Sequence, residues 1–482
     1  MLRVSTGGAY NAAVLPRLVI AALLLVALAL PTPAAAARPF ATGLTDFDAF
    51  SPGQDLGFAR ARGAGASYLR LVVGWSGVAP ASKPPGFDAT NPDDPAYHWA
   101  FYDDQVRRAV AHGLSPILSI VGAPRFARGQ YVQDRPNAVE LGRFATAAAR
   151  RYDGTHRGLP RVRYWEVWNE PNLSTFIYPQ HIHGRDFSPG LYHDLVERFS
   201  AGVKSVFRDN KVIAGSLAPF GKVGIDAVGP LRFMRELLCV DTRSAPRNAC
   251  ARPLRFDIWS IHPYTSGGPN HHAASPNDVS IADLPEMRQV LRHAYARHRI
   301  RSGRGVGFWV TEFGWDTSPP DPNTVPLAVH ARWIAEAMYR MWSSGVGLVT
   351  WFTLRDQALV RHLHSATLES GLYFRGRTLA RDRPKTLSLR AFRFPVFAER
   401  RGTLVHVWGR SPRGRTRVVI ELRHAGRWRV IARLRPSSYG VFETSRRART
   451  RRNDPVRARV GRELSVPFAL VHTRDRPVRP FG

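Results

Sequence analysis

The stretch RYWEVWNEPN, residues 163–172, places a carboxylate directly after an apolar segment. Positions 164–168 are rich in aromatic and β-branched residues, which favour a buried strand. Pro171 prevents the strand from continuing, because proline cannot donate to a central ladder. Glu170 is therefore predicted to stand at the carboxyl end of a strand, flanked by amide side chains.

Apolar runs of this kind recur along the chain and alternate with longer amphipathic segments, several of which end in glycine. The runs cover residues 40–46, 67–75, 114–124, 162–171, 211–219, 256–264, 307–315 and 347–356. Eight strands, each followed by a helix, predict an α/β fold of the (β/α)8 TIM barrel class. A doubly wound sheet is the alternative, but the glycine-rich phosphate loop typical of it does not follow an early run.

A barrel predicts a second carboxylate in the same mouth. Active sites of such barrels form at the carboxyl ends of the strands, and WVTEFGW (309–315) places Glu312 at the end of the seventh run. Glu170 and Glu312 can therefore converge although they lie far apart in the chain. Either carboxylate alone could cap a helix or pair with an arginine. Two of them, both among aromatic residues at strand ends, favour a catalytic pair.

Two carboxylates in an aromatic mouth suit glycoside hydrolysis, in which one attacks the anomeric carbon and the other exchanges a proton with the leaving oxygen. Aromatic rings can stack on the apolar faces of sugars, although any single tryptophan is more often part of a core. The strand-end candidates are Trp75, Trp168, Trp315, Trp351 and Phe352.

The motifs WNEPN (168–172) and TEFGW (311–315) resemble the two catalytic signatures of glycoside hydrolase clan A, particularly of families 5 and 39. The resemblance implies that Glu170 is the acid/base and Glu312 the nucleophile. It also implies that Asn169 donates to the sugar 2-hydroxyl.

Weaker matches extend the resemblance over residues 40–395. Arg70 resembles the strand-two arginine that keeps the nucleophile ionised in family 5. His262 and Tyr264 resemble the strand-six pair beside the nucleophile, and Trp351 resembles the tryptophan that floors the central sugar site. Family 5 usually carries a histidine after strand three, which the segment VGAPRFA (121–127) lacks, so the sequence indicates the clan and leaves the family open.

The first 37 residues are predicted to be a signal peptide. Basic residues precede an apolar run at 18–30, and small residues follow it up to Ala37. A membrane anchor is the alternative, but the run is shorter than the roughly 20 residues of a membrane span. We therefore expect a secreted, extracellular protein, with the barrel over residues 38–395.

Cys239 and Cys250 are the two cysteines of the chain. In an exported protein, such close spacing favours a local disulfide over a metal pair or a catalytic thiol. No histidine lies nearby at a zinc-like spacing, so we expect no metal and no other cofactor.

Residues 396–482 change pattern to short alternating runs, which predict a small all-β sandwich. From Ala398 onward there are 22 Arg and 6 acidic residues, so half of the net charge of +32 lies in this segment. The arginine excess over lysine reflects codon preference as much as phosphate binding, so we expect no specific nucleic acid partner. A solvated basic surface and adhesion to an anionic cell-wall polymer are the two interpretations. A carbohydrate-binding module is a further alternative.

The leading functional prediction is a secreted retaining glycosidase that cleaves β-linked glycosides or polysaccharides. A non-catalytic carbohydrate-binding barrel is the alternative from another class, and it would be favoured by loss of either glutamate. A transglycosylase would use the same residues with a sugar in place of water.

Overall fold

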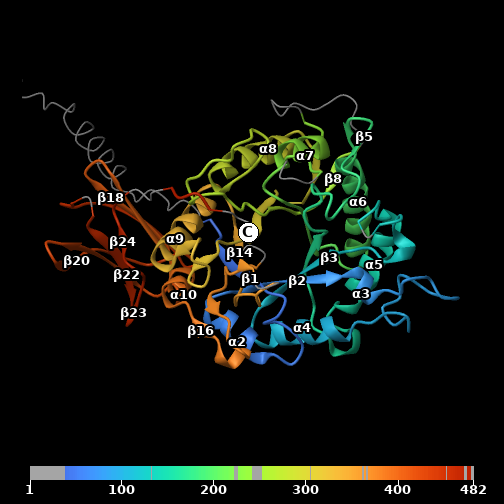
Figure 1. Cartoon of the computed structure of the whole chain (residues 1–482), viewed down its shortest axis with the longest axis horizontal. Helices are drawn as coiled ribbons and strands as arrows, with labels where there is room; N and C mark the ends of the chain where they lie inside the picture. Colours follow the sequence, from blue (N-terminus) through green and yellow to red (C-terminus); the bar gives the residue numbers. More distant parts are fainter. Residues whose placement is uncertain are drawn as a thin grey trace, which may run out of the picture. The chain divides into compact units, whose positions relative to one another are not determined.

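The computed structural model describes residues 38–478 except 132, 222–225, 241–251, 304, 361–362, 365–366, 452 and 472–474. Eight parallel strands form a closed barrel in which neighbours in sequence are neighbours in space, and Figure 1 shows helices surrounding it. The strands are β1 (Ala41–Thr45), β2 (Tyr68–Gly74), β3 (Ser115–Val121), β4 (Tyr164–Val167), β7 (Lys211–Leu217), β9 (Ile258–Ile261), β11 (Gly307–Phe313) and β14 (Leu348–Phe352). The predicted (β/α)8 barrel is confirmed.

A helix follows each barrel strand. The helices are α2 (Asp55–Gly63), α4 (Ala100–Ala111), α5 (Ala138–Arg151), α6 (Ser188–Val206), α7 (Pro230–Leu238), α8 (Leu284–Ala296), α9 (Leu327–Ser343) and α10 (Thr386–Arg393), with the short α3 (Trp75–Val78) before α4. Helix α5 illustrates why they form. Asn137 caps it by accepting from two backbone N–H groups, and a mostly alanine and aromatic face is buried against the barrel.

Short two-stranded pairs decorate the connections. They are β5 (His181–Ile182) with β6 (Arg185–Asp186), β8 (Leu254–Arg255) with β10 (Ile300–Arg301), β12 (Thr317–Ser318) with β13 (Val325–Pro326), and β15 (Tyr373–Phe374) with β16 (Arg383–Pro384).

The barrel interior changes character from bottom to top. Each strand contributes one side chain to an apolar layer at the amino-terminal end, made of Ala41, Tyr68, Ile117, Tyr164, Ile213, Ile258, Trp309 and Leu348. Side chains on one face of a strand recur every second residue, so the next inward positions lie one layer higher. At three of these strands they are Arg70, Ser119 and Glu166, all buried. The polar layer therefore lies between the apolar floor and the mouth.

The carboxyl-terminal region consists of two antiparallel sheets that begin at Val396, where the sequence predicts the change. One sheet holds β17 (Val396–Arg401), β18 (Leu404–Arg410) and β21 (Val441–Arg447). The other holds β19 (Val418–His424), β20 (Arg427–Leu434), β22 (Pro455–Val460), β23 (Glu463–Leu464) and β24 (Phe468–Ala469). Phe397 and Phe468 join the two sheets, with ring centroids 5.2 Å apart.

Two expectations concern residues beyond the described part of the chain. The predicted signal peptide covers residues 1–37, and the predicted bridge needs Cys250, so both stay predictions. Within the described residues, no helix is both long enough and apolar enough to cross a membrane.

Candidate active site

Glu170 is held at the end of β4 by a strained turn. Trp168 and Glu170 have φ angles of 68° and 40°, in the left-handed region that residues with a Cβ seldom adopt. Such conformations cost on the order of 1–3 kcal/mol each and persist only where surrounding contacts enforce them. Here the Glu170 N–H donates to the Ser216 carbonyl at 2.9 Å. The buried Asn172 amide donates to the carbonyls of Ala218 and Val228 and accepts from the Ala218 N–H, which ties the turn to the segment that follows β7.

Arg70 on β2 connects residues of the two carboxylate motifs, WNEPN and TEFGW. Its guanidinium donates from Nε to Glu166 at 2.5 Å, from Nη1 to Glu312 at 3.0 Å and from Nη2 to Asn169 Oδ1 at 2.7 Å. Arg70 is buried, so these bonds compensate for the removal of its charge from water. The contact expected between Arg70 and Glu312 is present.

Each carboxylate oxygen of Glu312 accepts a hydrogen bond from a different side chain. Tyr264 donates its hydroxyl to Oε1 at 2.8 Å, and Arg70 donates to Oε2. Charge-assisted bonds of this kind stabilise a negative carboxylate. Glu312 nevertheless keeps 15% of its side chain exposed, so it is reachable from the mouth.

Glu170 is exposed to a similar degree, 12% of its side chain, but no arginine or hydroxyl group in the described residues donates to it. Burial raises the pKa of Glu170 to about 7, although the Arg70 charge opposes the shift. His262 lies 3.0 Å from Glu170 through Nδ1, and 3.2 Å from the Thr311 hydroxyl through Nε2. Burial lowers the pKa of His262 to about 4 despite the nearby Glu312 carboxylate, so the ring is neutral near pH 7. A neutral His262 can accept a hydrogen bond at Nδ1 from the protonated Glu170 carboxyl group while its Nε2–H donates to the Thr311 hydroxyl.

The two carboxylates are close together. One ligand atom from each of Glu170, His262 and Glu312 lies within 4.8 Å of the others, a spacing that could also surround a cation. The guanidinium of Arg70 touches the same carboxylate of Glu312 and would repel a divalent ion there. The charge of Arg70 therefore disfavours a divalent ion beside Glu312.

Asn169 has an amide oxygen fixed by Arg70. This bond orients the amide so that its nitrogen is the free end, and no described residue accepts from that nitrogen. The Asn169 nitrogen is thus free to donate, and the role in binding a sugar hydroxyl that the resemblance implies stays a prediction.

The aromatic rim requires correction. Trp351 is fully buried, and its ring packs against His330 of α9 and Phe392 of α10, so it lies in the helix layer outside the barrel. Trp315 is 4% exposed, donates its indole N–H to the Gly267 carbonyl and contacts Trp351. Neither ring presents a free face to a sugar in this conformation.

Strand alternation explains the Trp351 correction. Leu348 faces the barrel interior, so Phe352 shares its side of β14 and Trp351 takes the other. Phe352 is itself 4% exposed, but it contacts Phe47, which follows β1 and is 57% exposed. Phe47 is the aromatic side chain beside this strand end that is open to solvent. Trp75 and Trp168 are buried as well.

Sequence reasoning misses three polar residues beneath the carboxylates. Glu166 accepts from Arg70 and from the Ser216 hydroxyl at 2.7 Å, and it is fully buried. Although burial alone would raise the pKa of Glu166, the Arg70 charge lowers it below its usual value. A charged residue in the middle of the apolar run YWEV needs a buried counter-charge. The arginine in the middle of YLRLV, Arg70, is the residue in the sequence from which this ion pair could have been predicted. Nothing in the sequence marks Ser216 or Thr311.

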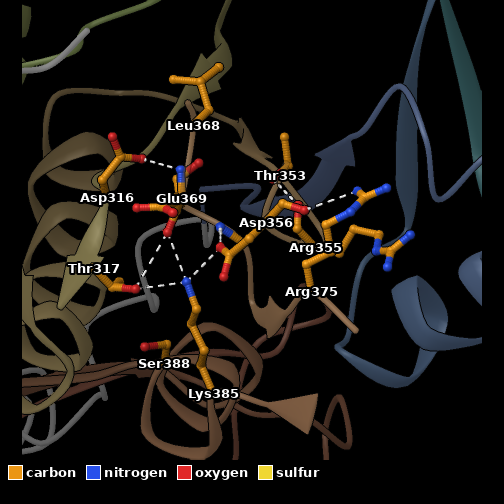
Figure 2. Close-up of polar contacts among 12 residues, drawn as sticks. Asp316, Thr317, Thr353, Arg355, Asp356, Leu368, Glu369, Arg375, Lys385 and Ser388 are labelled. Carbon is orange, nitrogen blue, oxygen red and sulfur yellow. Dashed lines mark hydrogen bonds and ion pairs between the residues drawn. The ribbon is translucent and has the colours of Figure 1, made fainter. Parts of the chain in front are cut away.

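A buried ionic cluster holds the loops behind β11 and β14, and Figure 2 shows its arrangement. Lys385 is fully buried and donates to Thr317 at 2.7 Å, to Asp356 at 2.6 Å and to the Glu369 carbonyl at 2.8 Å. Asp316 accepts from the Glu369 N–H at 2.7 Å. Burial raises the pKa of both Asp316 and Asp356 to about 7. The cluster fixes the segments that continue from the strand ends carrying Glu312 and Phe352.

No protein-family model matches the sequence, and no match is found among curated proteins. Among solved structures, the chain is similar to a family 39 glycoside hydrolase from the gut symbiont Bacteroides cellulosilyticus WH2, with a TM-score of 0.53 and 17% identity over 85% of this chain and 81% of that one. It is also similar to a family 39 β-xylosidase from Caulobacter crescentus, with a TM-score of 0.50 and 16% identity over 88% and 97% of the two chains. Likeness at this identity shows the fold.

Proposed function

We propose that this chain is a retaining glycoside hydrolase that cleaves β-linked glycosides or polysaccharides, with Glu170 as the acid/base and Glu312 as the nucleophile. The observation that carries the proposal is the contrast between two neighbouring carboxylates. Glu312 is bonded by Arg70 and Tyr264, whereas the pKa of Glu170 is raised to about 7. Carboxylates with divergent environments are the mark of an acid/base assignment. The fold likeness to two glycoside hydrolases supports the same class.

In the first step, a Glu312 oxygen attacks the anomeric carbon as the glycosidic C–O bond breaks. Glu170 transfers its proton to the departing oxygen, so the leaving group departs as a neutral alcohol and an ester to Glu312 forms. The close approach of the two carboxyl groups fits a retaining enzyme, which needs about 5–5.5 Å between them. Neutral His262 steadies Glu170 in its protonated state.

In the second step, Glu170 is a carboxylate and takes a proton from water as the water oxygen attacks the anomeric carbon. The ester bond to Glu312 breaks, and Glu170 regains its proton. Asn169 would donate to the sugar hydroxyl next to the anomeric carbon throughout. A sugar hydroxyl in place of water gives transglycosylation, so both outcomes use one site.

The test is azide rescue of two variants with an activated aryl β-glycoside. In Glu312→Ala no ester can form, so azide must attack directly and give a glycosyl azide of inverted configuration. In Glu170→Ala the ester forms, because the aryl leaving group needs little protonation, and azide then releases a product of retained configuration. Exchanged configurations would reverse the two roles. Full activity of both variants would show that Glu170 and Glu312 are not the catalytic residues. No cleavage by the unmodified protein of any glycoside that it binds would favour the non-catalytic carbohydrate-binding barrel.

We further propose that the mature protein is secreted and acts on an extracellular glycan, on the basis of the predicted signal peptide. Phe47, which is 57% exposed and contacts Phe352, offers an aromatic face beside the strand ends on which a sugar ring could stack. A panel of aryl β-glycosides, xylosides among them, identifies the sugar, and product analysis on polysaccharides separates endo from exo action.

A further inference from the structure

A second cavity lies at the opposite end of the barrel from Glu170 and Glu312. It has a volume of about 450 Å³, which is within the range of small-molecule sites. The residues Phe40 and Ala41 before β1 and Ser67 before β2 form one wall, at the amino-terminal ends of the strands. The loop after β18 and the segment before β21 form the other wall.

Three arginines line this cavity: Arg62 at the end of α2, Arg393 at the end of α10 and Arg410 at the end of β18. Arg393 is paired with Glu463, at 2.7 Å from its Nε. In the described residues, neither Arg62 nor Arg410 has an acidic partner within salt-bridge distance. The cavity therefore carries an excess of positive charge.

Arg410 is the most exceptional of the three. Its Nε atom is buried and has no hydrogen-bond partner in the described part of the chain. Burial lowers the pKa of Arg410 to about 10, and the charges of Arg393 and Arg62 add to the shift. A buried donor without a partner is unfavourable, above all on a charged group, and native proteins rarely keep one without a ligand or water to satisfy it.

The rest of the lining supplies hydroxyl groups and an aromatic ring. Ser67, Ser411 and Ser438 lie in the wall, and Tyr439 stands at the rim with 47% of its surface exposed. Arginines bind phosphate and sulfate oxygens in a fork geometry, hydroxyl groups bind either oxygens or sugar hydroxyls, and an aromatic ring can contact a sugar face.

We infer that this cavity is a binding site for a sugar that carries a phosphate or sulfate group, with Arg410 and Arg62 holding the anionic group and Tyr439 contacting the ring. The site is separate from the proposed catalytic mouth. The anionic sugar could be free or could be a unit of a polymer, and both share the chemistry that the arginines recognise.

The test measures binding of glucose 6-phosphate, glucose and inorganic phosphate to the full chain by calorimetry, at constant ionic strength. Wild-type protein should bind the phosphosugar, and glucose should not compete. Arg410→Gln and Arg62→Gln should each weaken binding about tenfold or more, because each removes a charge-assisted bond. Arg433→Gln is the matched control, since Arg433 is exposed, lies outside the cavity and changes the net charge equally.

The melting temperature of the same variants is a second readout, and it separates a ligand-binding role of Arg410 from a structural one. Without ligand, Arg410→Gln should raise the melting temperature, because it removes a charge that repels Arg62 and Arg393. A lower melting temperature with binding retained would overturn the proposal and make Arg410 a structural residue. Equal weakening in all three variants, or no binding, would also overturn it. Dextran sulfate, a polymer of sulfated glucose units, is the third probe and tells a polymer unit from a free sugar. Binding of this polymer that depends on Arg410 assigns the polymer, and binding of the monomer alone assigns the free sugar.

Discussion

At the scale of single residues, the site depends on one arginine that serves two carboxylates of different function. Arg70 compensates Glu166 below and contacts Glu312 above, while Glu170 gains no donor from it. Side chains from four strands thereby give Glu312 and Glu170 different surroundings, although the two carboxylates lie only a few ångströms apart. The hydrogen bonds that stabilise the charge of Glu312 can be removed without changing Glu170, and the ionisation of Glu170 can be removed without changing Glu312. Tyr264→Phe tests the first effect and Glu170→Gln tests the second.

The first prediction concerns the ionisation of Glu170. Its pKa of about 7 means that the protonated form is lost as the pH rises through 7, so kcat/KM on a substrate with a poor leaving group should fall about tenfold per pH unit above that value. With an activated aryl substrate, which needs no proton, the unmodified protein should show no such limb, and Glu170→Gln should lack the limb with either substrate. A pH profile of kcat/KM for both proteins checks this. An alkaline limb that survives in the variant would assign the titration to another group.

The second prediction concerns Tyr264. Tyr264→Phe removes the hydroxyl that donates to Glu312 Oε1 at 2.8 Å and leaves the ring in place. Hydrogen bonds to charged groups contribute about 1.5–3 kcal/mol, so kcat/KM should fall about 10- to 100-fold with little change in stability. Tyr68→Phe is the control, because Tyr68 lies in the apolar floor and its hydroxyl meets only that of Tyr164. Equal losses in both variants would show that packing of the barrel, rather than the Glu312 bond, is being measured.

At the scale of elements, the strand–helix order and the strand ends are predictable, but the face of each side chain is less so. The run 162–171 contains β4, and the breaks at Pro171 and after Glu312 locate both carboxylates. Trp351 and Phe352 are neighbours with equal β propensity, and only the inward position of Leu348 in the folded barrel fixes which of them faces the mouth. Ser216 and Thr311 come into contact with Glu166 and His262 only when the barrel closes. No local sequence pattern predicts these contacts.

The loops between elements depend on buried charge, and the third prediction tests Lys385. Lys385→Met leaves Asp356 buried without its cation, and breaking one side of a buried pair costs about 3–5 kcal/mol. The pKa of Asp356 is raised to about 7 in the folded state, so its contribution is fully present below the unfolded pKa and is lost as the pH rises. The destabilisation should therefore be larger at pH 8 than at pH 5.

Urea unfolding at both pH values measures this difference. Lys83→Met is the matched control, because Lys83 forms an exposed ion pair with Glu140 and should cost less than about 1 kcal/mol. Adding Asp356→Asn to Lys385→Met should restore part of the lost stability at pH 8. A cost that is independent of pH, or no recovery in the double variant, would show that Lys385 acts through packing of its alkyl chain.

At the scale of the whole molecule, the carboxyl-terminal sheets share a core with the barrel. The alternating pattern and basic charge of residues 396–482 predict a separate β-sandwich accessory domain. The structure instead buries Trp408 of β18 completely against Phe40, Tyr339 and Trp342, with ring centroids 5.6–5.8 Å apart. Tyr339 also stacks on Phe397 at 4.2 Å. Deleting the sheets would therefore expose an aromatic surface on α9.

The last prediction is that these sheets and the barrel unfold together. Trp408→Ala should cost about 3–5 kcal/mol, because it leaves a cavity in the aromatic contact, and it should lower the temperature at which the Glu170–Glu312 site is inactivated. Trp428→Ala is the control, since Trp428 contacts Arg457 within the same sheets and should change that temperature little. Calorimetry should show a single transition that Trp408→Ala moves as a whole. Two transitions, with inactivation unchanged in Trp408→Ala, would mean that the barrel is stable alone and that the basic sheets are the separable accessory domain that the sequence predicts.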